Sequence, residues 1–189
     1  MITPVMKNEL GWRIDDRMND RQLAIIRNAV ARILEGIELP TGGHEREWLG
    51  RYCGGTYIHL GGLPADLARW FNGAPTSIVL PVHDIWLSEG FDGFPMPEQH
   101  FLHELGHVVD NCSAVRKWVP ATLFGSGFGD KLTRSLGGHP AGLRYCNRSG
   151  GIPCRWQWTG RGYYGNHSSA DYFAEAFAWF FWDAKVLPD

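Results

Sequence analysis

One stretch of the sequence, PEQHFLHELGHVVD from Pro97 to Asp110, constrains the fold and the chemistry more than any other. Its centre, HELGH, has the pattern HExxH. Apolar residues recur around this pattern at helical spacing: Phe101, Leu102, Leu105, Val108 and Val109. Pro97 suits a first helical turn, because its missing N–H would be unpaired there anyway. We therefore expect a helix that is buried along most of its length.

Two histidines four residues apart lie on one face of a helix, so His103 and His107 can point at one metal ion. Paired neutral imidazoles suit zinc, and a catalytic zinc site takes a third protein ligand and keeps one position open for water. Glu104 is then placed to take a proton from the zinc-bound water as a general base. Asp110 falls on roughly the same face, where it would accept a hydrogen bond from an imidazole N–H.

The last helical pattern in the chain offers the third ligand. Ser168 and Asp171, three residues later, predict a capping box at the start of a helix that runs to Trp182. This helix is apolar almost all round, and Glu175 is the one ionisable group in its interior. A buried carboxylate is costly without a cation, and binding zinc would remove that cost. Asp171 is the rival ligand, although the cap already explains its presence.

The length predicts one domain over residues 1–189, and the order of helix, strands and metal helix favours an α+β class with a small mixed sheet. Patterning and turn signals predict its parts: a loose N-terminal segment over 1–19, a helix over 21–35 that Asp20 caps, a polar connection over 41–50, strands over 56–60, 77–80 and 83–88, a short helix over 64–71, and a Gly-rich insert over 113–165. Within this plan, we expect residues 84–88 to present a free strand edge to an extended peptide.

The net charge limits the classes of partner that we expect, and the cysteine content bears on the cellular compartment. The formal net charge is −2, which gives no electrostatic reason to expect nucleic acid as a partner. No apolar run is long enough for a membrane span, and the first residues lack the apolar core of a signal peptide. Of the four cysteines, Cys146 and Cys154 bracket a turn-rich segment that a disulfide would close. Four reduced thiols are the equal alternative.

The two helical motifs, HELGHVVD and DYFAEAFAWFF, resemble those of the anthrax lethal factor-like zinc metallopeptidases and the related secreted clostridial proline-specific endopeptidases. Those families carry HExGHxxD on one helix and FAEAF on a later one, and the resemblance spans about residues 78–182. It implies a zincin-like metallopeptidase domain that hydrolyses peptide bonds. It also implies His103, His107 and Glu175 as zinc ligands, with Glu104 as the base.

These families place a tyrosine that stabilises the transition state seven residues before the ligand glutamate, where this chain has Ser168. Tyr164 is our candidate for the role, because neighbouring glycines let its loop bend inward. Three other residues stay open as alternatives: Tyr163, His167 and Tyr172.

The predicted function is therefore a zinc-dependent endopeptidase, in a toxin or effector that is secreted or otherwise delivered outside the producing cell. Its partners would be a protein or peptide substrate and an inhibitor or immunity protein. Reduced cysteines would instead indicate the cytoplasm. Two alternatives stay open, namely a zinc amidase that acts on cell-wall peptide and a non-catalytic zinc-binding module. Intact Glu104 counts against the second alternative, since a structural site needs no base.

Overall fold

The computed structural model describes residues 6–7, 10–36, 45–62, 77–80, 83–115 and 169–182. These residues form four longer helices: α2 (Asp20–Gly36), α3 (Glu45–Cys53), α5 (Pro97–Val115) and α8 (Ser169–Trp182). They also form four strands: β1 (Arg13–Ile14), β2 (Tyr57–Leu60), β3 (Ser77–Leu80) and β4 (Asp84–Leu87). A combination of helices with one small sheet confirms the predicted α+β class in this coarse sense. The predicted helix over 64–71 lies outside the described residues.

The sheet has the strand order β1-β2-β4-β3. Strands β1, β2 and β4 run parallel, and β3 pairs antiparallel with β4. The predictions of strands over 56–60, 77–80 and 83–88 are confirmed to within one residue at each end. The prediction of a free edge at residues 84–88 is wrong, because β4 pairs with β2 on one side and with β3 on the other. Within the described sheet, the free edge beside β4 belongs to β3.

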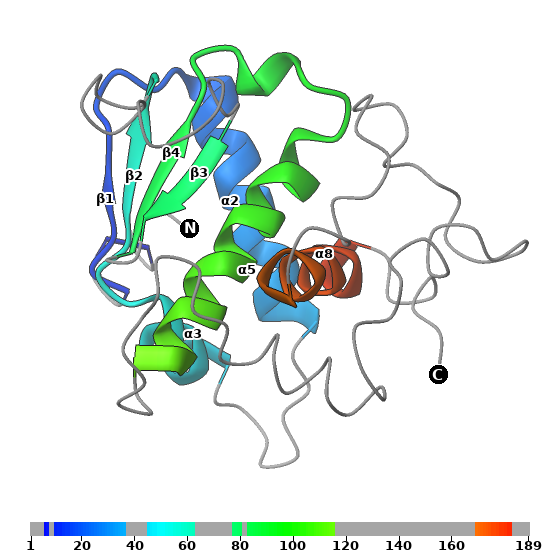
Figure 1. Cartoon of the computed structure of the whole chain (residues 1–189). Coiled ribbons are helices and arrows are strands. Elements are labelled where there is room, and N and C mark those ends of the chain that lie inside the picture. Colours follow the sequence, from blue (N-terminus) through cyan, green and yellow to red (C-terminus); the bar gives the residue numbers. More distant parts are fainter. Residues whose placement is uncertain are drawn as a thin grey trace, which may run out of the picture.

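The sheet buries one face against the helices. Four side chains of β2 and β4 that point to this face are buried: Ile58, Leu60, Ile85 and Leu87. Helix α5 packs against β3 and β4 on one side and against α8 on the other, and Figure 1 shows it crossing the molecule between the sheet and α8. The opposite face carries an aromatic stack in which His59 lies 3.9 Å from Trp86, centroid to centroid. The HELGH motif is therefore carried by a helix that contacts both the sheet and α8.

The N-terminal segment is more ordered than we predicted. Residues 13–14 form β1, and Trp12 is buried with its indole N–H donating to the carbonyl of Cys53 at 2.6 Å. A strand of two residues has no periodicity of its own, because it exists through its pairing with Tyr57 and Ile58. The expected loose segment over 1–19 therefore needs correction at its C-terminal end.

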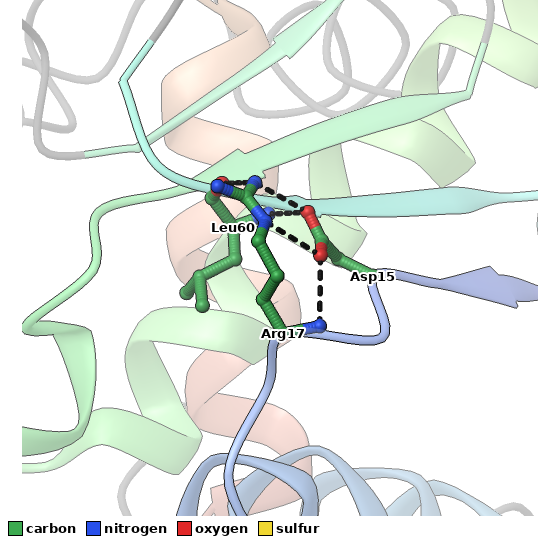
Figure 2. Close-up of polar contacts among 3 residues, drawn as sticks. All are labelled: Asp15, Arg17 and Leu60. Carbon is green, nitrogen blue, oxygen red and sulfur yellow. Dashed lines mark hydrogen bonds and ion pairs between the residues drawn. The ribbon is translucent and has the colours of Figure 1, made fainter.

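Asp15 and Arg17 fasten this segment to the end of β2 (Figure 2). The Asp15 carboxylate accepts hydrogen bonds from the Arg17 guanidinium at 2.7 and 3.0 Å, and from the N–H of Leu60 at 3.1 Å. Arg17 also donates to the Leu60 carbonyl. Hydrogen bonds from Arg17 hold the pKa of Asp15 well below its usual range, although burial acts in the opposite direction.

Helix α2 is capped by Asn19, one residue before Asp20, the residue that we predicted as the cap. The side chain of Asn19 accepts from the N–H of Gln22 at 2.9 Å, and the Gln22 side chain accepts from the N–H of Asn19 at 3.0 Å. Asp20 is thus the first helical residue, and its negative charge stabilises the N-terminal end of the helix. The predicted helix over 21–35 is confirmed.

Helix α3 was not predicted, because residues 41–50 read as a polar connection. Its sequence, EREWLGRYC, alternates charged residues with only a few apolar ones. Leu49 and Cys53 are nevertheless fully buried, and α3 packs against α5. A helix of nine residues draws its stability from such contacts more than from propensity. Among the described residues, no helix is both long and apolar enough to cross a membrane.

Candidate metal centre

The predicted helix around HELGH is confirmed as α5, and it brings His103 and His107 together. Their Nε2 atoms lie 3.2 Å apart, and the two rings are nearly perpendicular at 83°. Nitrogens that each bind one tetrahedral zinc at about 2.0–2.1 Å would be about 3.3 Å apart. The same distance suits a hydrogen bond when one ring is protonated on Nε2. The donor pair therefore fits a shared zinc ion without a large rearrangement.

Glu104 lies on the same helix in a protected position. Its exposed fraction is 5%, and that of the neighbouring His103 is 8%, whereas His107 is half-buried. Within the motif, the side chain of His107 is therefore more exposed to solvent than those of His103 and Glu104.

His100 adds a third imidazole one turn before Glu104. Burial lowers the pKa of His100, and the charge of Glu104 acts in the opposite direction. The ring packs edge-on against Phe94, with centroids 5.1 Å apart. Its packing holds His100 near the predicted base.

Asp110 is fully buried one turn beyond His107. This is the position that we predicted for a side chain that accepts from an imidazole N–H. That Asp110 accepts a hydrogen bond from an imidazole stays a prediction.

Helix α8 crosses α5 at the motif itself. A Cβ atom on Gly106 would lie 2.8 Å from the Cα of Ala174, which is closer than real Cβ contacts, and 3.2 Å from its carbonyl oxygen. It would also lie 3.2 Å from the Cβ of Phe177. Only glycine permits this approach, and Glu175 directly follows Ala174. The crossing therefore brings the backbone beside Glu175 to the backbone beside His107.

The role of Gly106 was missed in the sequence, although a signal was present. Glycine inside a helix costs about 1 kcal/mol relative to alanine, so an interior glycine calls for a reason. A close helix crossing is such a reason. The sequence alone did not say which helix would cross there.

The remaining predicted site residues fall outside what the structure describes. The side chains of Glu175, Asp171 and Tyr172 on α8 are not described, and neither are residues 116–168, which include Tyr164 and His167. Among the described side chains, no three His, Cys, Asp or Glu groups gather as a complete metal-binding set. The third zinc ligand and the oxyanion donor thus stay predictions.

No protein-family model matches this chain. No curated protein matches it, and no solved structure does so either.

Proposed function

We propose that this chain is a zinc-dependent endopeptidase with a zincin-like fold. The observation that carries the proposal is the 3.2 Å separation of the His103 and His107 Nε2 atoms, next to the buried carboxylate of Glu104. These two histidines would hold the zinc, and Glu175 would complete the protein ligands. The crossing of α8 over Gly106 supports that choice, because it brings the backbone of residue 174 to the motif.

The chemistry divides between the metal and the protein. Zinc in such a site polarises a carbonyl and lowers the pKa of water. Glu104 takes a proton from the attacking water and delivers it to the leaving amine, which turns a poor leaving group into a neutral one. A hydroxyl or N–H donor stabilises the oxygen of the scissile carbonyl as its negative charge develops, and Tyr164 is the candidate donor.

An extended peptide is the substrate that the sheet favours. Strand β3 lies at the edge of the described sheet, antiparallel to β4, and α5 packs against both strands. A peptide that pairs with β3 by strand addition would run alongside the helix that carries the motif. Main-chain hydrogen bonds would then hold the peptide regardless of its sequence, and side-chain contacts would select the cleavage site.

The test is digestion of a peptide library by the zinc-loaded protein and by Glu104→Gln. We expect cleavage by the wild type and a loss of turnover by at least about 10²-fold in Glu104→Gln, because the general base is gone. Glu98→Gln is the matched control. Glu98 lies on the same helix but binds Asn28 at 2.8 Å and Arg32 at 3.2 Å, away from the motif.

Normal cleavage by Glu104→Gln would contradict the proposal. Equal losses in both variants would also contradict it, because they would indicate a loosened helix rather than a missing base. Hydrolysis of cell-wall peptide with no cleavage of the library would favour an amidase instead.

A further inference from the structure

Two cysteines that are distant in the sequence lie on the packed helices α3 and α5. Cys53 is the last residue of α3 and Cys112 lies in the C-terminal half of α5. Both are free thiols, with exposed fractions of 0% and 8%. The Cys112 thiol donates to the carbonyl of Arg51, two residues before Cys53, at 3.7 Å. Both side chains therefore enter the same part of the interface.

The geometry of packed helices brings such a pair within reach of a bond. Helix axes in contact lie about 8–10 Å apart, and Cα atoms lie about 2.3 Å from each axis. Facing Cα atoms are then about 3.4–5.4 Å apart, a range that overlaps the span of about 4.4–6.8 Å between Cα atoms in disulfides. The electrostatics agree with this closeness. Burial raises the pKa of Cys53, and the negative charge of an ionised Cys112 raises it further.

We propose that Cys53 and Cys112 form a disulfide under oxidising conditions, and that this bond ties α3 to the helix that carries HELGH. The proposal does not depend on the peptidase assignment, because neither cysteine belongs to the HELGH motif. It also differs from the pairing that we predicted for Cys146 and Cys154, which lie outside the described residues.

The bond would form by exchange with a small-molecule disulfide such as oxidised glutathione. Cys112, the less buried of the two, attacks as a thiolate and releases one glutathione thiolate. The thiolate of Cys53 then attacks the Cys112 sulfur and releases the second. The two protons that the cysteines lose go to the two released thiolates. In the folded protein the pair is buried, so exchange requires α3 to lift from α5 or takes place before α3 packs.

A Cys53–Cys112 disulfide would raise the free energy of unfolding more than a Cys146–Cys154 disulfide. It joins residues on two helices, and cross-links that close longer loops remove more freedom from the unfolded chain. An intracellular form with both thiols reduced and an exported form with the bond would therefore differ in stability. The helix of the predicted metal site would be more firmly held in the exported form.

The test uses a Cys146→Ser/Cys154→Ser variant, which leaves Cys53 and Cys112 as the two thiols of the chain. The variant is unfolded, refolded in a glutathione redox buffer, alkylated, and analysed by intact mass and peptide mapping with and without reductant. We expect a monomer that has lost two hydrogens, with the peptides of Cys53 and Cys112 joined. We also expect a Tm about 10 °C above that of the reduced form. Adding Cys53→Ser should abolish the link and leave a glutathione adduct on Cys112.

Two free thiols in a folded chain would overturn the proposal, and so would two separate glutathione adducts. If the double variant does not fold, the oxidised wild type is mapped instead. There we expect Cys53 joined to Cys112, and a bond from either of them to Cys146 or Cys154 would contradict the proposal.

Discussion

Gly106 of α5 and Ala174 of α8 lie so close that a single added carbon on Gly106 would stand 2.8 Å from the Cα of Ala174. This contact lies between Glu104 and His107 in one helix and directly before Glu175 in the other. The closest approach of the two helices therefore lies within the candidate metal centre. A change in the packing there should alter both stability and metal binding.

Gly106→Ala tests this coupling. We expect the free energy of unfolding to fall by about 1–3 kcal/mol, because the added methyl forces the helices apart. Zinc retention should weaken as well, since α8 would carry Glu175 away from the histidines. Urea denaturation and metal analysis measure the two effects.

Gly50→Ala is the control, because Gly50 lies inside α3 and its added methyl would meet no atom within 4 Å. That variant should gain up to about 1 kcal/mol from better helix propensity. Unchanged stability and zinc retention in Gly106→Ala would show that the crossing does not support the site.

The third ligand is tested by two matched amide substitutions on α8. Glu175→Gln should lose most of its zinc during dialysis, because a neutral amide oxygen is a weaker ligand than a carboxylate. Asp171→Asn, one turn earlier, should retain its zinc. The reverse outcome in metal analysis would assign the ligand to Asp171.

Tyr164 is predicted to donate a hydrogen bond to the developing oxyanion. Tyr164→Phe should lower kcat by about 10²–10³ and leave KM and zinc content nearly unchanged, because the donor acts in the transition state. Tyr163→Phe tests the adjacent alternative in the same way, and steady-state kinetics on one peptide provide the measurement. Full activity in Tyr164→Phe together with a large loss in His167→Ala would move the role to the histidine.

Asp15 makes stability depend on pH. Its pKa is lowered in the folded state by hydrogen bonds from Arg17, so its contribution is present above its unfolded pKa of about 3.9 and is lost as the pH falls towards the folded value. Asp15→Asn should therefore be clearly less stable than wild type at pH 7 and much closer to it at pH 2 by urea denaturation. Asp16→Asn removes the same charge from an exposed neighbour and should show little effect. A wild-type advantage that is equal at both pH values would contradict this account.

Periodicity in the sequence was enough to predict α2, α5, α8 and the three longer strands. It failed where tertiary contacts decide the structure. Strand β1 exists through pairing with β2, and α3 is stabilised by burying Leu49 and Cys53. The expected all-round burial of α8 is also wrong, because Phe180 is 46% exposed.

Within the candidate site, the convergence of His103 and His107 follows from helical spacing alone and was predictable. The approach of Ala174 to Gly106 was not, because it depends on how two distant segments pack. The position of the Cys53–Cys112 pair was hidden for the same reason. Its first member lies on α3, a helix that the sequence did not reveal.

The most direct test of the central claim is X-ray absorption spectroscopy of the zinc-loaded protein, combined with metal analysis. The account predicts one zinc per chain, bound by nitrogen and oxygen atoms at about 2.0–2.1 Å, with imidazole scattering that is lost in a His103→Ala/His107→Ala variant. A chain that binds no zinc would contradict the account. So would zinc held by sulfur at about 2.3 Å, which would move the metal to the cysteines.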